Sequence, residues 1–143
     1  MDKQDAFTFF HPLRVRWAEC DGQGIVFNVN YFLYFDLGIT EYMRALGFSG
    51  DNMLEFYTVN AQADFRGSAA FDEEIEVAVR CARIGTKSMT YAMAIFRGGE
   101  LLTEGTLTYV HAERGTQTSS PIPDFVTARI LDFEKTPPVR KAA

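Results

Sequence analysis

Alternation between apolar and polar residues runs through most of this chain and limits its fold more than any other feature. Side chains of a β-strand point to opposite faces in turn, so this pattern is typical of strands that bury one face. It predicts five strands, at about 12–19, 59–66, 74–81, 89–95 and 101–111. Gly98-Gly99 is typical of a tight hairpin, and we expect the last three strands to form an antiparallel meander.

One segment, from about 28 to 46, has helical spacing instead. Gly47 follows it at the position where a left-handed residue commonly ends a helix. Most of the segment's surface is apolar, which predicts a helix buried on most sides. Gly38 within it is tolerable if the helix packs closely against a neighbour. The apolar residues at helical spacing are Phe32, Phe35, Ile39, Tyr42, Met43 and Leu46.

The order of strand, helix and four further strands predicts an α+β fold. A five-stranded antiparallel sheet should curl around one long central helix. At 143 residues the chain is expected to form a single domain, 1–143. A weaker helix is predicted on the outside at 123–133, and residues 1–10 and 136–143 are expected to be loose tails.

Composition argues against several functional classes. The net charge of −5 disfavours nucleic acid as a partner, although clustered cations could still bind an anionic ligand. No apolar stretch is long enough to insert into a membrane, and no signal peptide is visible. Cys20 and Cys81 form no disulfide framework, so we expect a cytoplasmic protein in which both are ordinary packed residues.

The stretch AECDGQGIVFNVNYF, residues 18–32, places an acidic residue before a glycine-containing corner and the aromatic helix. Asp favours turns, so Asp21 could simply shape the corner. A carboxylate at the mouth of a buried helix could instead do chemistry. The residues alone leave both interpretations open.

Together with this order of elements, the longer stretch RWAECDGQGIVFNVNYFLYFD resembles the hotdog-fold thioesterases, in the branch of the 4-hydroxybenzoyl-CoA thioesterases. The segments ADFRGSAAFDEEIEV and GTKSMTYAMAIFRGGELLTEGTLTYV resemble that branch too, so the likeness covers about residues 11–112. It implies an acyl-CoA thioesterase that needs no cofactor beyond the coenzyme A of its substrate. The positions on the family pattern are Trp17, Asp21, Gly24, Ile25, Val26, Phe27, Tyr31 and Phe35.

The resemblance assigns catalysis to Asp21, as general base or as nucleophile. We expect the backbone N–H groups of Gly24, Ile25 and Val26, near the start of the helix, to hold the thioester oxygen. Glu19, the first acid of the family's pair, should follow the strand alternation and point away from the working face of the corner.

The resemblance also implies residues that bind the substrate. Arg83, Lys87 and Ser88 flank a hairpin where this branch contacts the nucleotide, although solvated surface cations are an equal alternative. The residues assigned to substrate binding are Asn28, Tyr31, Ser68, Arg83, Lys87 and Ser88.

Several alternatives stay open. Glu41 on the helix is a second candidate for the catalytic carboxylate. His11 and His111 are the only histidines and both lie on strand patterns, and no Cys/His cluster has metal-ligand spacing, so we expect no metal. The substrate could be an acyl carrier protein thioester, or the chain could bind acyl thioesters without cleaving them. The family likeness implies a homodimer or homotetramer with its active site between subunits, since a lone sheet leaves an exposed edge.

Overall fold

The computed structural model describes residues 3–141, and its main elements follow the predicted order. Strand β1 (Phe9–Arg14) precedes the central helix α1 (Asn30–Ala45), and α2 (Asp124–Phe133) follows the last long strand. The remaining strands are β2 (Phe56–Phe65), β3 (Glu74–Ile84), β4 (Ser88–Arg97), β5 (Glu100–His111) and β6 (Val139–Arg140). Three 3-10 turns are η1 (Lys3–Ala6), η2 (Trp17–Glu19) and η3 (Gly50–Asn52).

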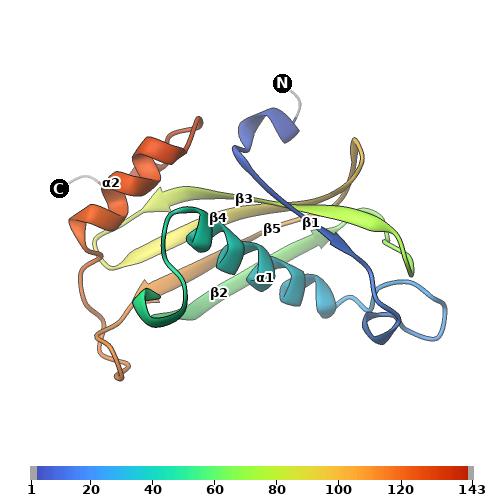
Figure 1. The fold of residues 1–143 in the computed structure, drawn as a ribbon, viewed down its shortest axis with the longest axis horizontal. Helices are drawn as coiled ribbons and strands as arrows, with labels where there is room; N and C mark the ends of the chain where they lie inside the picture. Colours follow the sequence, from blue (N-terminus) through green and yellow to red (C-terminus); the bar gives the residue numbers. More distant parts are fainter. Residues whose placement is uncertain (1–2, 142–143) are drawn as a thin grey trace.

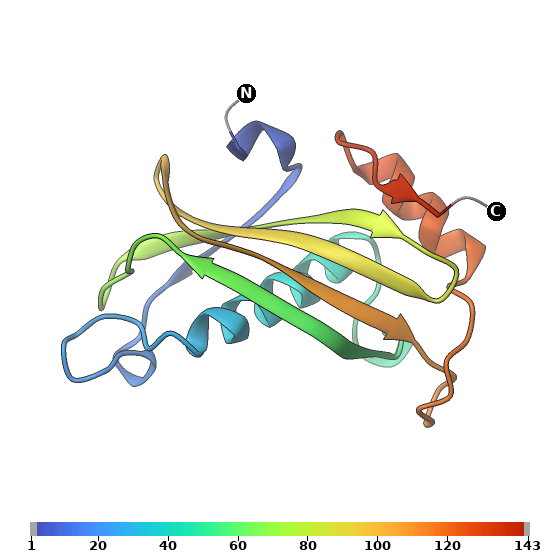
Figure 2. The same cartoon turned by 180° about the vertical axis from the view of Figure 1, so that it is seen from behind.

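The strands form one sheet in the order β1-β3-β4-β5-β2, in which every neighbouring pair is antiparallel. Figures 1 and 2 show this sheet curling around α1. The predicted hotdog architecture is therefore confirmed. β6 adds a short further strand, parallel to the end of β3, and β2 forms one edge of the sheet.

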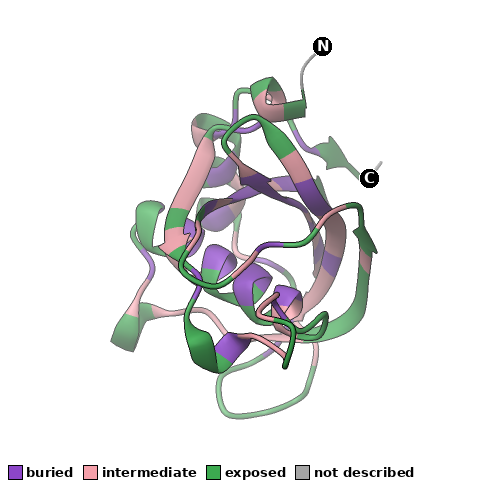
Figure 3. Cartoon of the chain, turned by 90° about the vertical axis from the view of Figure 1, so that its right-hand side faces the viewer, coloured by how far each residue is buried: buried purple, intermediate pink, exposed green. Residues whose placement is uncertain are grey.

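A close contact at Gly38 sets how near α1 lies to the sheet. A Cβ atom built on Gly38 would lie 2.6 Å from Val77 Cγ1 and 3.0 Å from Val79 Cγ2, so only glycine lets the helix approach β3 this closely. Figure 3 shows the buried residues of α1 and of the strands gathered inside the curl. The core is therefore the space between this helix and the concave face of the sheet.

Both ends of α1 lie within two residues of the predicted ones. The helix begins at Asn30, after a turn in which the Asn30 N–H donates to Phe27 O at 2.8 Å. It ends where Gly47 takes a φ of +97° and the Phe48 N–H donates back to Met43 O at 2.9 Å. That left-handed glycine satisfies carbonyl groups of the last turn, as the sequence predicts.

The first strand differs from the predicted 12–19. β1 ends at Arg14, opposite Glu74, because its partner β3 begins there. The chain then enters the 3-10 turn η2, where the Glu19 carboxylate accepts the Arg16 N–H at 2.8 Å. Apolar alternation continues beyond the end of the partner strand, so alternation alone could not mark where pairing stops.

Both ends of the described chain carry structure where loose tails were expected at 1–10 and 136–143. Phe9 and Phe10 belong to β1, and Phe7 is buried in a small cluster on the outer face of the sheet. Near the other end, Thr136 Oγ1 donates to Ala6 O at 2.8 Å, which ties the two ends together. Residues 1–2 and 142–143 lie outside the described part of the chain.

Helix α2 lies outside the curl, as predicted (Figure 1). Glu134 directly follows it, and its carboxylate accepts the Tyr42 hydroxyl at 2.6 Å and the Cys81 N–H at 2.8 Å. These bonds join the end of α2 to α1 and to β3. Burial raises the pKa of Glu134, although both hydrogen bonds act in the opposite direction.

Candidate active site

The corner between β1 and α1 is held in shape by its own backbone. The Asp21 N–H donates to Ile25 O at 2.9 Å, and the Gly24 N–H donates to Asp21 O at 3.1 Å. Gly24 has a φ of +79°, in the left-handed region that favours glycine. The corner is therefore a closed turn that begins at Asp21.

The segment between β2 and β3 holds this corner in place through backbone hydrogen bonds. The Val26 N–H donates to Ala69 O and the Phe71 N–H donates to Gly24 O, both at 2.9 Å. The Ala69 N–H donates to the Tyr31 hydroxyl at 3.0 Å, which ties the same segment to the first turn of α1. The corner consequently has a defined position relative to both the helix and the sheet.

The Asp21 side chain is half-buried and only partly used by the turn. Its Oδ1 accepts the Gln23 N–H at 2.8 Å, a bond typical of Asp at a turn. No group within residues 3–141 donates to its other oxygen, Oδ2. The turn thus engages one carboxylate oxygen and leaves the second available.

Glu19 lies in the 3-10 turn η2, so the expectation that it follows the alternation of a strand is wrong. It is 7% exposed, and it accepts the Tyr34 hydroxyl at 2.9 Å and pairs with Arg16 at 2.9 Å. Burial acts to raise the pKa of Glu19, but the bonds from the Arg16 backbone, the Tyr34 hydroxyl and the Arg16 guanidinium together hold it below its ordinary value. β1 ends before Glu19, so this residue is free to turn inward. There its ionised carboxylate is buried and stabilises the turn before the corner.

The backbone N–H groups expected to hold the thioester oxygen are only partly free. Those of Gly24 and Val26 already donate to carbonyl groups of the chain. The Ile25 N–H has no acceptor within residues 3–141, and the same holds for Asn28 and Val29 just before α1. Between Asp21 and Val29, the N–H groups without an acceptor in the described residues are therefore those of Gly22, Ile25, Asn28 and Val29.

The other predicted binding residues near the corner differ in exposure. Asn28 is exposed, whereas Tyr31 is only 1% exposed and its hydroxyl accepts the Ala69 N–H. Ser68 is exposed, and its carbonyl accepts Arg97 at 3.1 Å. Asn28 and Ser68 therefore face solvent in this chain, while Tyr31 packs inside it.

Arg83, Lys87 and Ser88 come together at the turn between β3 and β4, where they line a pocket of about 430 Å³. Lys141 lines the same pocket, and the sequence did not single it out. In Figures 1 and 2 this turn and the Asp21 corner lie at opposite ends of the molecule. Helix α1, with 16 residues and a length of about 24 Å, runs between those ends.

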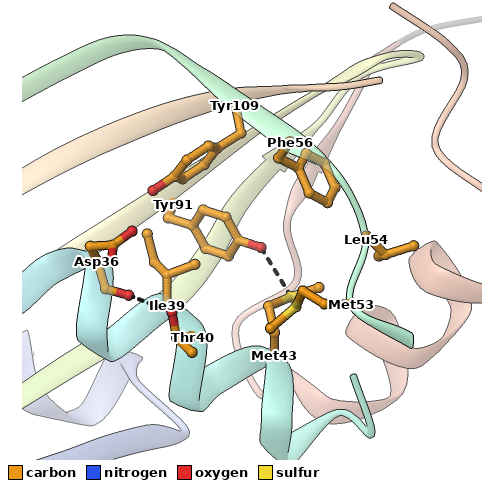
Figure 4. A pocket seen from close by; sticks show the side chains of 9 residues that line it. All are labelled: Asp36, Ile39, Thr40, Met43, Met53, Leu54, Phe56, Tyr91 and Tyr109. Carbon is orange, nitrogen blue, oxygen red and sulfur yellow. Dashed lines mark hydrogen bonds between the residues drawn. The ribbon is translucent and has the colours of Figure 1, made fainter. Parts of the chain in front are cut away.

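A separate apolar cavity of about 140 Å³ lies between α1 and the sheet, as Figure 4 shows. Aromatic rings of Phe56, Tyr91 and Tyr109 form its sheet side, and the Tyr91 hydroxyl contacts Met43 Sδ at 3.4 Å. Asp36 on α1 is exposed at the rim. The cavity can hold a small apolar group.

The alternative catalytic groups have ordinary structural surroundings. Glu41 forms an ion pair with Arg44, one helical turn away, at 3.1 Å. Burial raises the pKa of the Cys81 thiol to about 12, which keeps it protonated. His111 Nδ1 lies 3.0 Å from Ser120 Oγ in the loop after β5. Within residues 3–141, no group of three or more His, Cys, Asp or Glu side chains is arranged to hold a metal.

In the described part of the chain, no helix combines the length and the apolar character that crossing a membrane requires.

Known proteins resemble this chain in both sequence and structure. Residues 23–104, more than half of the chain, match the thioesterase superfamily. The acyl-CoA thioesterase YbgC of Haemophilus influenzae is 23% identical over 125 residues, which cover 84% of this chain and 92% of that protein. A Thermus thermophilus thioesterase in complex with coenzyme A and Zn superposes with a TM-score of 0.82 at 24% identity, covering 93% of this chain and 98% of its own. Slr0204, a 1,4-dihydroxy-2-naphthoyl-CoA thioesterase from Synechocystis, gives a TM-score of 0.79 at 18% identity, covering 87% and 96%. This chain therefore belongs to the thioesterase superfamily and is a thioester hydrolase with the hotdog fold.

Proposed function

We propose that this thioester hydrolase cleaves acyl-CoA, with the Asp21 carboxylate as its catalytic group. One observation carries the proposal: the same short segment holds the Asp21 carboxylate, with one unengaged oxygen, and the Ile25 and Asn28 N–H groups, which have no acceptor within residues 3–141. Thioester hydrolysis needs a base or nucleophile and donors for the oxyanion that develops on the carbonyl oxygen. Both kinds of group occur at this corner.

Two chemical routes fit this arrangement. As a general base, Asp21 takes a proton from water while the water oxygen attacks the carbonyl carbon, and the C–S bond then breaks to release CoA thiolate. As a nucleophile, its carboxylate attacks that carbon directly, expels the thiolate and forms an anhydride that water hydrolyses. In either route the Ile25 and Asn28 N–H groups stabilise the negative oxygen of the tetrahedral intermediate.

The cations at the β3–β4 turn favour coenzyme A as the carrier of the acyl group, because coenzyme A has phosphate groups that they could bind. Arg83, Lys87 and Ser88 line one pocket, and a basic side chain beside a hydroxyl suits a phosphate group. The Thermus thermophilus neighbour described as a coenzyme A complex supports the same assignment. Acyl carrier protein is the alternative carrier, since a cationic patch could also contact an acidic protein.

The acyl group is proposed to occupy the cavity beside Phe56, Tyr91 and Tyr109. Its volume of about 140 Å³ is close to the roughly 150 Å³ of an apolar protein cavity that accepts benzene. One aromatic ring or a short aliphatic chain therefore fits. Asp36 at the rim would disfavour a long apolar chain that extends past it.

A second copy of the chain is proposed to complete the site. The Asp21 corner and the cation pocket lie at opposite ends of one chain (Figures 1 and 2). β2 is an edge strand, and Val59 and Phe65 on it are 52% and 45% exposed. Pairing two β2 edges would cover these side chains and could place one chain's corner beside the partner's cations.

Asp21→Asn tests the catalytic assignment. Asn keeps an oxygen for the Gln23 N–H, so the turn should persist, while the charge is lost. Turnover of acyl-CoA should fall on the order of a hundredfold to ten-thousandfold, the range for losing a positioned base. The unfolding midpoint and the affinity for CoA should stay close to those of the wild type.

Asp51→Asn is the matched control, because Asp51 is an exposed aspartate of the 3-10 turn η3 whose side chain makes no bond within residues 3–141. It should retain full turnover. Glu19→Gln cannot serve as the control, since Glu19 is buried and supports the corner. Full activity in Asp21→Asn would reject the assignment, and Glu41→Gln would then be the next variant to measure.

A further inference from the structure

The C-terminal segment reaches the β3–β4 turn through a short parallel pairing. In β6, Val139 pairs with Arg83 and Arg140 with Ile84, and the Lys141 N–H then donates to Ile84 O at 3.1 Å. Pro138, just before β6, is buried, which anchors the segment on the fold. The pairing of β6 with β3 therefore positions Lys141 at the pocket.

The cations around this turn lack carboxylate partners. Within residues 3–141, Arg83, Lys87, Arg140 and Lys141 form no ion pair, although Asp124 lines the neighbouring hollow with Arg140 and Lys141. Ion pairs elsewhere engage Lys3, Arg14, Arg16, Arg44, Arg66 and Arg97. A chain with a net charge of −5 thus gathers several unpaired cations at one place. Such a cluster is suited to an anionic ligand.

The pocket also offers neutral donors of the kind that phosphate groups accept. Ser88 contributes a hydroxyl, and the backbone N–H groups of Thr86 and Lys87 have no acceptor within residues 3–141. Lys87 Nζ lies 3.4 Å from Ser119 Oγ, a long contact that a stronger acceptor would displace. Cations, a hydroxyl and free amides together match the phosphates of a nucleotide.

We propose that Lys141 binds a phosphate group of the CoA nucleotide, so that the C-terminal segment is part of the substrate site. This inference rests on the proposed function. An acyl carrier protein presents the same pantetheine arm without the adenine nucleotide. Lys141 is therefore a specificity residue that favours free acyl-CoA over the carrier-protein thioester, and it acts on substrate binding without touching the reacting carbonyl.

Lys141→Ala tests this with two substrates that share one acyl group, acyl-CoA and the corresponding acyl-pantetheine. The KM for acyl-CoA should rise about tenfold, the lower end expected for losing a hydrogen bond to a charged group, with kcat unchanged. Kinetics on acyl-pantetheine should not change. Lys135→Ala is the matched control, because Lys135 is exposed in the same C-terminal segment but does not line this pocket.

The Kd of CoA itself, measured by calorimetry, separates this inference from the proposed function. A tenfold weaker Kd in Lys141→Ala supports the inference even if no thioester tested is hydrolysed, an outcome that would reject only the proposed function. An unchanged Kd and KM in Lys141→Ala, with a clear loss in Lys87→Ala, would overturn the role of Lys141 alone. An equal loss on acyl-CoA and on acyl-pantetheine would overturn it as well, because the effect would then be structural.

Discussion

Replacing Gly38 with alanine is expected to destabilise this protein, although alanine is the better helix former. The added Cβ would lie 2.6 Å from Val77 Cγ1, inside the 3.0 Å limit that real Cβ atoms essentially never cross. Val77 and Val79 are fully buried. Their strand, β3, is paired with β1 on one side and β4 on the other, so neither side chain can retreat without disturbing the sheet.

The expected magnitude follows from two opposing effects. Overpacking a core costs about 1–3 kcal/mol, and two close contacts on a central strand favour the upper end, about 3 kcal/mol. Replacing glycine by alanine within a helix stabilises the folded state by about 1 kcal/mol through its higher helix propensity. The net loss is about 2 kcal/mol, which should lower Tm by roughly 4–8 °C for a chain of this size.

Urea unfolding at one fixed protein concentration measures this loss, since self-association would otherwise change the apparent stability. Gly99→Ala is the matched control, because no atom lies within 4 Å of its added Cβ, and it should change stability by no more than about 0.5 kcal/mol. Adding Val77→Ala to Gly38→Ala should show a favourable coupling of about 1 kcal/mol or more. A Gly38→Ala protein as stable as the wild type would refute the reasoning, because helix propensity would then outweigh the contact.

Two further variants test the corner and the sheet edge. Glu19→Gln should cost about 2 kcal/mol near pH 7 because it disturbs a buried network with Arg16 and Tyr34. The pKa of Glu19 is lowered in the folded protein, so its contribution is present above the unfolded pKa and is lost as the pH falls through the folded one. Unfolding curves of the two proteins should therefore converge in acid, and a constant gap at every pH would contradict this. At the edge, the wild type should sediment as a dimer or larger assembly, and Val59→Lys should shift it towards monomer with reduced activity. A fully active wild-type monomer would exclude an active site shared between chains.

Much of the fold could be predicted because alternation and helical spacing are strong local signals here. The helix around Ile39 and the strands that carry Val77 and Met93 each repeat one period over many residues. What escaped prediction depended on distant partners. The end of β1 at Arg14 depends on where β3 begins, and the two-residue β6 is too short to show any period.

The sequence predicted which residues form the corner of the candidate site, but it did not predict most of their contacts. The glycine at position 24 marks the corner, because glycine adopts the positive φ found there more readily than other residues. Which N–H groups remain free was not predictable, because Val26 donates to Ala69, a residue 43 positions later in the chain. Lys141 left no local signal, because only the pairing of β6 with β3 brings it to the turn.

The placement of the Asp21 corner and the cation pocket at opposite ends of one chain has a genetic consequence (Figure 1). In a dimer whose sites combine one chain's corner with its partner's cations, a chain that lacks the carboxylate can still supply working cations to its neighbour. Mixing subunits of Asp21→Asn and Lys87→Ala would create hybrids in which one site carries both defects and the other carries neither. At acyl-CoA concentrations too low to saturate the Lys87→Ala protein, two defective alleles could then give activity together that neither gives alone.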